Sequence, residues 1–237
     1  MAAIEHIKYY SHILNRDINL EITGHWGYPI LMFPTSCGRY IQNRDFKLNE
    51  SVIHFVDSGK IKLYNIETLD EQSFYNDSVS SEVRIRNYDL YMQFLQKEFI
   101  PYLQTQCNTH RIATAGCSFG GFHAANTAFR FPDLVSHMFS MSGVFSIRNF
   151  VPDTDDIKVY FNCPEEFMSH EESWRFKHLN IVLSTSDWDS CKPKNKKMAE
   201  VLDAKGIPYW YDEKKWIEHD WPLWRMVFPE YINKYFN

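Results

Sequence analysis

The chain has 237 residues, the length of one large domain, and its 25 Lys and Arg against 30 Asp and Glu give a net charge of −5. A composition that is 44% hydrophobic and 23% charged excludes a disordered, collagen-like or low-complexity chain. Because there is no basic excess to hold a polyphosphate, the charge balance argues against nucleic acid as a partner.

The cysteines and the N-terminal residues bear on the compartment. The five cysteines are widely spaced and include no C-x-x-C pair, so we expect free thiols in a reducing cytoplasm. The first eight residues reach a charge at Glu5 without an apolar run, so we expect no signal peptide. The stretch between Arg111 and Arg130 carries no charge, but its glycines and its change of hydrophobic period indicate a buried strand and helix, not a membrane span.

Short apolar runs alternate with helical stripes along the chain. In chain order, the pattern predicts a strand at 28–33, a loop at 34–38, strands at 51–56 and 62–66, a helix over 88–103, a strand at 111–116, a helix over 119–131, strands at 135–142 and 181–184, a helix over 193–205, a strand at 208–216 and a helix over 222–236. This alternation predicts a single-domain α/β fold over 1–237, with a mostly parallel twisted sheet covered by helices on both faces.

The segment 143–178 fits the alternation least. It is acidic, and its aromatic residues include those at positions 145, 150, 160 and 167. An insertion between two strands of such a sheet predicts a cap over the functional site. The alternative is a solvated helical excursion with no role in function.

Residues 115–121 read Ala-Gly-Cys-Ser-Phe-Gly-Gly, at the point where a predicted strand gives way to a predicted helix. This G-x-S-x-G spacing is that of a nucleophile elbow centred on Ser118. A serine at such an elbow adopts a strained, positive-φ turn that brings strand and helix close, so side chains two residues away would collide. Gly116 and Gly120 occupy those two positions, which predicts Ser118 as the nucleophile.

The neighbouring thiol of Cys117 fails the same test. The residues two positions away from it are Ala115 and Phe119, and a phenylalanine does not fit at such a close approach. We therefore interpret Cys117 as a packing residue.

A serine nucleophile needs a base, and at a nucleophile elbow the order along the chain is serine, acid, histidine. Of the ten histidines only His170, His178 and His219 come late enough to follow an acid. His170 lies in the 143–178 insertion and His178 directly precedes a predicted strand. His219 lies in a loop between the last predicted strand and helix, so we expect it to be the general base.

The acid should follow the strand at 181–184, where two carboxylates are available. Asp187 is the nearer to the predicted strand end and is our preferred acid. Asp189 is the alternative, although it is also suited to the start of the following helix. Asp220 would point away from the ring of its neighbour His219.

Two backbone N–H groups should form an oxyanion hole. The residue after the nucleophile, Phe119, supplies one, and the loop after the strand at 28–33 supplies the other, with Ser36 and Cys37 as candidates. No metal-binding or phosphate-binding motif is present, so we expect neither a metal nor a cofactor.

The chain resembles the putative esterase family of α/β hydrolases, which includes esterase D, feruloyl esterases and bacterial mycolyltransferases. The resemblance covers nearly the full length. It rests on the motifs Ala-Gly-Cys-Ser118-Phe-Gly-Gly and His219-Asp-Trp-Pro-Leu-Trp, with support from Gly27-Tyr-Pro-Ile-Leu-Met-Phe-Pro and Ser186-Asp187.

This resemblance implies a triad of Ser118, Asp187 and His219, the same residues that the pattern favours. The chain departs from the family at the oxyanion loop, where many members carry His-Gly and this sequence has Pro34-Thr35. The departure leaves open the second oxyanion donor and the acyl group that is accepted.

The sequence therefore predicts a cytoplasmic serine hydrolase that cleaves a small-molecule carboxylic ester through an acyl-enzyme on Ser118. One alternative is an acyltransferase that uses the same triad with an alcohol in place of water. The other is a non-catalytic binding protein on the hydrolase fold.

Overall fold

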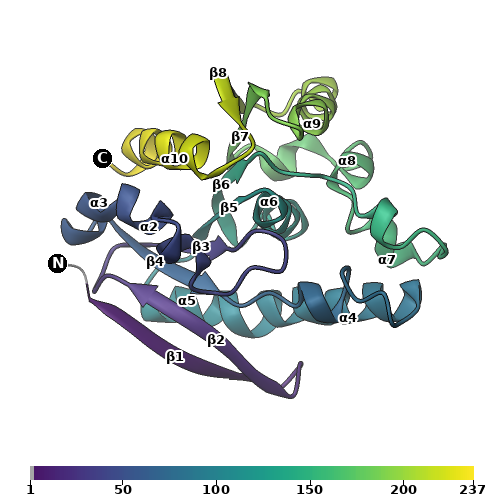
Figure 1. Cartoon of the computed structure of the whole chain (residues 1–237), viewed down its shortest axis with the longest axis horizontal. Coiled ribbons are helices and arrows are strands. Elements are labelled where there is room, and N and C mark those ends of the chain that lie inside the picture. Colours follow the sequence, from purple (N-terminus) through teal and green to yellow (C-terminus); the bar gives the residue numbers. More distant parts are fainter. Residues whose placement is uncertain (1–2) are drawn as a thin grey trace.

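An eight-stranded sheet forms the centre of the computed structural model, which describes residues 3–237 (Figure 1). The first two residues of the domain predicted over 1–237 lie outside this part. The strands are β1 (Ile4–Ser11), β2 (Arg16–Thr23), β3 (Tyr28–Phe33), β4 (Ile61–Ile66), β5 (Ile112–Cys117), β6 (Val135–Met141), β7 (Asn180–Trp188) and β8 (Trp210–Glu218).

The strand order across the sheet is β1-β2-β4-β3-β5-β6-β7-β8. From β4 to β8 every neighbouring pair is parallel, whereas β1 and β2 form an antiparallel hairpin that joins β4 antiparallel. The predicted single-domain α/β fold with a mostly parallel sheet is confirmed.

Helices cover both faces of this sheet, as predicted (Figure 1). One long helical segment runs from α4 through a π-helical turn at Leu95–Phe99 into α5. The helices are α1 (Gln42–Asp45), α2 (Leu48–Ser51), α3 (Ile53–Asp57), α4 (Ser81–Phe94), α5 (Ile100–Gln106), α6 (Phe119–Arg130), α7 (Ile157–Tyr160), α8 (Pro164–Phe167), α9 (Lys192–Lys205) and α10 (Trp221–Phe236).

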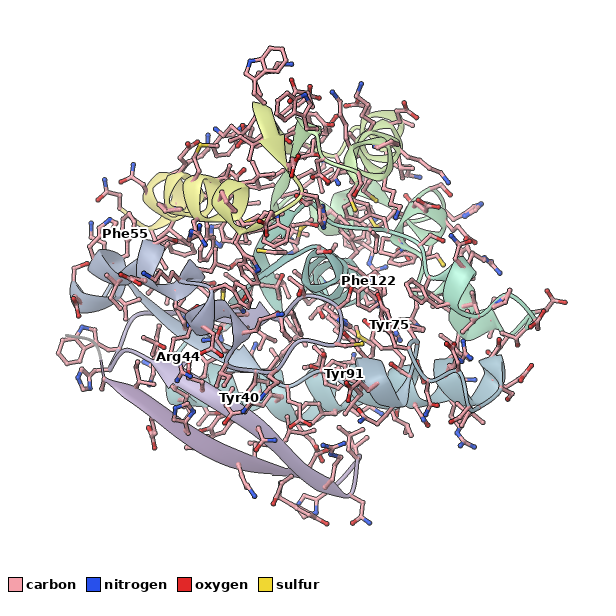
Figure 2. All side chains as sticks on the ribbon, viewed as in Figure 1. Tyr40, Arg44, Phe55, Tyr75, Tyr91 and Phe122 are labelled. Carbon is pink, nitrogen blue, oxygen red and sulfur yellow. The ribbon has the colours of Figure 1, made fainter. Side chains whose placement is uncertain are left out.

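Each face of the sheet has its own hydrophobic core. Side chains of α2, α3 and α10, among them Phe55 and Phe228, form the core on one face. Side chains of α4, α5, α6 and α9, among them Tyr91 and Phe122, form the core on the other (Figure 2). The strands buried between the two cores are apolar on both sides, which explains why they read as continuous apolar runs in the sequence.

The strand predicted at 51–56 is wrong, because this segment is helical in α2 and α3. The buried side chains Leu48, Val52, Phe55 and Val56 follow the spacing i, i+4, i+7 and i+8, which is the apolar spacing of a helical segment and not the period of two of a strand. A short apolar run taken without its flanking residues does not distinguish a strand from a buried helix.

The hairpin of β1 and β2 was not among the predicted elements. Its sequence signal is a period of two, since Ile18, Leu20 and Ile22 are buried and β2 contacts the core with these side chains. The remaining predicted strands and helices all correspond to elements of the structure, with shifts at their ends.

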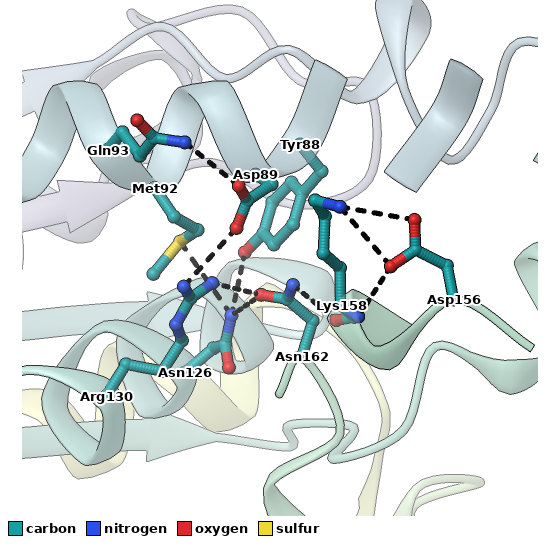
Figure 3. Close-up of polar contacts among 9 residues, drawn as sticks. All are labelled: Tyr88, Asp89, Met92, Gln93, Asn126, Arg130, Asp156, Lys158 and Asn162. Carbon is teal, nitrogen blue, oxygen red and sulfur yellow. Dashed lines mark hydrogen bonds and ion pairs between the residues drawn. The ribbon is translucent and has the colours of Figure 1, made fainter. Parts of the chain in front are cut away.

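The segment 143–178 contains the short helices α7 and α8 and is attached to the helices beneath it. Asn162 Oδ1 accepts hydrogen bonds from Asn126 Nδ2 and from Arg130, both on α6, at 2.8 Å each (Figure 3). We call this segment the cap. Among residues 3–237, no helix combines the length and the apolar character needed to cross a membrane.

Candidate active site

Ser118 lies between the end of β5 at Cys117 and the start of α6 at Phe119. Its backbone has φ 56° and ψ −121°, a conformation that L-residues rarely adopt and that costs about 1–3 kcal/mol. The surrounding close packing compensates for this strain, because both adjoining elements are buried. The turn leaves the Ser118 side chain partly exposed while its neighbours are covered.

The two glycines of the motif are required by close backbone contacts. A Cβ atom on Gly116 would lie 2.2 Å from the carbonyl oxygen of Gly120. A Cβ atom on Gly120 would lie 2.5 Å from the carbonyl oxygen of Pro34, in the loop after β3. Both positions therefore exclude any side chain larger than a hydrogen, as expected from the sequence, and the 34–38 loop lies against the elbow.

Ser118, His219 and Asp189 form a continuous chain of hydrogen bonds. The Ser118 hydroxyl lies 2.9 Å from Nε2 of His219, and Nδ1 of His219 lies 2.7 Å from Oδ1 of Asp189. In a neutral imidazole with its proton on Nδ1, the ring donates to the carboxylate and accepts from the serine. The contacts join residues that are 101 and 30 positions apart in the sequence.

The preferred acid of the sequence analysis, Asp187, does not contact the imidazole. Its Oδ1 accepts a 2.6 Å hydrogen bond from the backbone N–H of Trp216 instead. The physical reason is the length of β7, which continues to Trp188 instead of ending at Ser184. The first carboxylate beyond the strand is therefore Asp189, the alternative that the sequence left open.

Asp189 is 4% exposed and is held in place by further donors. The Thr185 hydroxyl donates to its Oδ2 at 2.9 Å, and the backbone N–H of Cys191 donates to its Oδ1 at 2.7 Å. A buried carboxylate without such partners would be costly, and these donors also fix its orientation toward His219.

The pKa values of the pair are shifted in opposite directions. Burial by itself would lower the pKa of His219, but the hydrogen bonds and charges of Asp189 and Cys191 outweigh it and raise that pKa to about 9. Burial by itself would raise the pKa of Asp189, but hydrogen bonds from His219, Ser142 and the Cys191 backbone lower it. The surroundings therefore favour the imidazolium, the form that a general base reaches after taking a proton from serine.

The loop that carries His219 joins β8 to α10 and is packed against the core by tryptophans. The His219 ring makes an edge contact with Trp224 at a centroid distance of 5.2 Å. Trp224 is 3% exposed, and its Nε1–H donates to the Ser142 hydroxyl at 2.9 Å. These contacts restrict the imidazole to the position from which it reaches Ser118.

The other late histidines and Asp220 have different surroundings. His170 lies beside the Tyr160 hydroxyl in the cap, with 2.9 Å between the oxygen and Nδ1. His178 Nε2 lies 2.7 Å from the carbonyl oxygen of Pro132. Asp220 occupies the N-cap position of α10 without a side-chain hydrogen bond to the helix, and its carboxylate lies near the positive end of the helix dipole.

The two candidate donors in the 34–38 loop differ in availability. The backbone N–H of Cys37, one of the two candidates, donates to Oδ2 of Asp70 at 3.0 Å and is therefore already used within the protein. Within residues 3–237, neither the Ser36 nor the Phe119 backbone N–H has an acceptor. Ser36 is therefore the loop residue whose donor remains available beside Phe119.

A pocket of about 820 Å³ opens in front of Ser118 and His219. Aromatic side chains of Tyr75, Phe145 and Phe150 line part of its wall. Charged side chains of the cap and of α9 line another part. Among them, Glu165 Oε1 of the cap forms an ion pair with Lys197 Nζ of α9 at 2.8 Å. The cap residues thus form part of the pocket wall at the site.

Cys117 and Cys191 differ in their relation to the site. Cys117 is fully buried, and burial raises the pKa of its thiol well above the usual range, as expected for a packing residue. Among the described residues, one group could supply metal ligands, namely Asp189, Cys191 and His219, whose donor atoms lie within 4.8 Å of one another. Two of these three side chains are already bonded to each other in the chain that leads to Ser118.

Residues 33–235 match the family described as putative esterase. The chain belongs to the putative esterase family. This confirms the resemblance seen in the sequence, and it assigns the chain to the carboxylic ester hydrolases. No curated protein matches the chain.

Solved structures share the fold across the whole chain. FphF of Staphylococcus aureus, a fluorophosphonate-binding serine hydrolase, has a TM-score of 0.77 at 13% identity, and the match covers 100% of this chain and 99% of the FphF chain. An S-formylglutathione hydrolase of S. aureus has a TM-score of 0.73 at 13% identity, covering 100% and 97%. A ferulic acid esterase of Anaeromyces mucronatus has a TM-score of 0.70 at 14% identity, covering 99% and 91%. At these identities, the likeness concerns the fold.

Proposed function

We propose that the protein hydrolyses a small-molecule carboxylic ester through an acyl-enzyme on Ser118, with His219 as general base and Asp189 as the acid of the triad. The observation that carries the proposal is the contact chain of 2.9 Å and 2.7 Å through the imidazole. Three residue types with complementary chemistry meet there from distant parts of the sequence. Such an arrangement activates a hydroxyl that is a weak nucleophile on its own.

The reaction proceeds in two stages, acylation of Ser118 and hydrolysis of the acyl-enzyme. The Ser118 oxygen attacks the ester carbonyl carbon while its proton moves to His219 Nε2, and the imidazolium then gives this proton to the leaving alcohol. Water replaces the alcohol, gives a proton to the imidazole and attacks the acyl-enzyme. Collapse of the second intermediate releases the carboxylic acid and returns the proton to Ser118.

The oxyanion of both intermediates accepts hydrogen bonds from the backbone N–H groups of Phe119 and Ser36. Support comes from their free donors and from the place of both residues in the pocket wall beside Ser118. Each such donor contributes about 3–4 kcal/mol to lowering the barrier. The Phe119 donor also lies at the N-terminus of α6, where the helix dipole favours a negative charge.

The pocket size and composition support a compact substrate. A volume of about 820 Å³ is in the range that takes a drug-sized small molecule. The aromatic part of the wall suits an apolar portion of the ester. The five free thiols support a reducing cytoplasmic location for the reaction.

A matched pair of variants tests this function. Ser118→Ala should lower the kcat of p-nitrophenyl acetate hydrolysis by about 10⁴-fold or more, because it removes the nucleophile. Cys117→Ala should retain activity within about five-fold, because this thiol is buried away from the pocket. Loss of activity in the thiol variant together with retention in the serine variant would refute the assignment.

A further inference from the structure

The loop that supplies the Ser36 donor is tied to a buried carboxylate. Asp70 is 1% exposed, and its Oδ2 accepts the backbone N–H of Cys37, the residue after Ser36, at 3.0 Å. Cys37 itself has a φ of 53°, which a non-glycine residue maintains only where its surroundings impose it. The bond to Asp70 is thus one of the contacts that set the course of the loop.

Asp70 is in turn held by a histidine on α6. Nε2 of His123 lies 2.9 Å from Oδ1 of Asp70, and His123 is also 1% exposed. A carboxylate at this depth needs a hydrogen-bonding partner to offset its lost hydration. His123 stands only four residues after Phe119, so the partner belongs to the helix that begins with the other oxyanion donor.

A buried tyrosine fixes which nitrogen of His123 carries the proton. The Tyr88 hydroxyl lies 3.0 Å from Nδ1 of His123. The same hydroxyl accepts a 3.4 Å hydrogen bond from Asn126 Nδ2 (Figure 3). Since the Tyr88 oxygen already accepts from Asn126, its O–H is the group that can donate to Nδ1. The Nε2–H of His123 is then directed at Asp70, and every donor in the row meets an acceptor.

A second set of hydrogen bonds, through Tyr75, connects Asp70 to Ser36. The backbone carbonyl of Asp70 accepts the N–H of Tyr75 at 2.9 Å, and the Tyr75 hydroxyl donates to Ser36 Oγ at 2.9 Å. The Tyr75 ring contacts Phe119 at a centroid distance of 5.4 Å (Figure 2 labels Tyr75). The contacts through Asp70 and those through Tyr75 therefore both connect the 34–38 loop to the first residues of α6.

We propose that Asp70 and His123 are positioning residues that hold the Ser36 and Phe119 backbone donors at a fixed separation. The proposal rests on the proposed function, because only an oxyanion makes this separation matter. Neither side chain touches the substrate. Their effect is transmitted through the loop, and a displacement of about 1 Å at a reacting site can cost about 100-fold in rate.

The variant His123→Ala removes the partner of Asp70 without altering any pocket residue. We expect kcat for p-nitrophenyl acetate to fall by about 100-fold and KM to change by less than about three-fold, since an oxyanion donor acts in the transition state. His123→Gln should recover at least ten-fold of this loss, because one glutamine amide can donate to Asp70 and accept from Tyr88.

Alkylation of Cys37 gives a readout that does not depend on turnover. Partial desolvation and the charge of Asp70 raise the pKa of this thiol to about 11, so its reaction with iodoacetamide at pH 8.5 is slow. Release of the loop in His123→Ala should accelerate labelling at Cys37, located by peptide mapping, by at least five-fold. The exposed position of the thiol makes it accessible to the reagent.

The matched control is Thr127→Val, a buried α6 position one turn further along whose hydroxyl has no hydrogen-bond partner among the described residues. It should leave both kcat and Cys37 labelling at the wild-type level. If His123→Ala unfolds, Tyr88→Phe replaces it, with a smaller change expected in the same direction for both measurements. Folding of each variant is verified by circular dichroism.

The proposal is overturned if folded His123→Ala keeps kcat within three-fold of wild type, or if kcat falls while Cys37 labelling is unchanged. It is also overturned if Thr127→Val reproduces both effects. Absence of turnover in the wild type would count against the proposed function instead. The labelling rate of Cys37 would still test whether His123 and Asp70 hold the 34–38 loop in place.

Discussion

The Nδ1–H of His219 donates a 2.7 Å hydrogen bond to Oδ1 of Asp189, a carboxylate that is 4% exposed and also accepts from Thr185 and the Cys191 backbone. Two residues earlier, Asp187 accepts from the Trp216 backbone. The two acids are close in sequence and differ in surroundings, so they form a natural pair for substitution.

Replacement of Asp189 by asparagine should lower kcat by about 10³–10⁴-fold, because an amide no longer stabilises the imidazolium or the correct tautomer. Asp187→Asn keeps an oxygen acceptor for Trp216 and should retain kcat within about three-fold. Steady-state kinetics with p-nitrophenyl acetate separates the two. A larger loss in Asp187→Asn than in Asp189→Asn would contradict the assignment of the acid.

The pH profile should report the raised pKa of His219. A protonated imidazole does not accept the serine proton, so kcat/KM should rise with pH through an apparent pKa that lies above 6.5 and toward about 9. In Asp189→Asn the attraction to the carboxylate is lost, so that burial, which lowers the pKa of His219, is opposed only by Cys191. The midpoint of the residual activity should then move to lower pH, and identical midpoints in both proteins would argue against the coupling.

The close contacts at the elbow predict different costs for three glycines. Gly116→Ala and Gly120→Ala each push a Cβ against backbone, so each should lower the free energy of unfolding by about 3 kcal/mol and abolish activity. Gly206 ends α9 with a φ of 64° and open space around it, so Gly206→Ala should cost only about 1 kcal/mol. Urea denaturation of the three variants measures this, and equal costs would disprove the packing account.

Attachment of the cap depends on Asn162. Asn162→Ala leaves Asn126 and Arg130 without this acceptor and should lower the free energy of unfolding by about 1–3 kcal/mol (Figure 3). The neighbouring pair of Lys158 with Asp156 lies nearer the surface, so Lys158→Ala should change stability by less than about 1 kcal/mol. Denaturant titration gives both free energies of unfolding. A larger loss of stability in Lys158→Ala than in Asn162→Ala would contradict the role of Asn162 in attaching the cap.

The elbow was predictable because its constraint is local. The steric demand on Gly116 and Gly120 acts within five residues of sequence, so the motif carries it completely. The candidate base, His219, was found by elimination, since chain order leaves few histidines after Ser118. Its contact with Ser118 then followed from the parallel sheet, which brings the carboxyl ends of its strands to one edge.

The acid was not fixed by the sequence because strand ends shift by a few residues. β7 extends to Trp188 through a register irregularity next to β8, and nothing in Ser184–Trp188 marks where pairing stops. The pair of Asp70 and His123 carries no local signal at all, since the two lie 53 residues apart and meet only in the folded core. Tertiary contacts of this kind also decide which loop N–H remains available.

Covalent labelling by a fluorophosphonate probe tests the central claim most directly, because the probe reacts preferentially with an activated serine. We predict one adduct per chain, mapped to Ser118, and labelling that is slowed at least about 100-fold in His219→Ala. Labelling at another serine, or equal rates with and without the His219 imidazole, would contradict it.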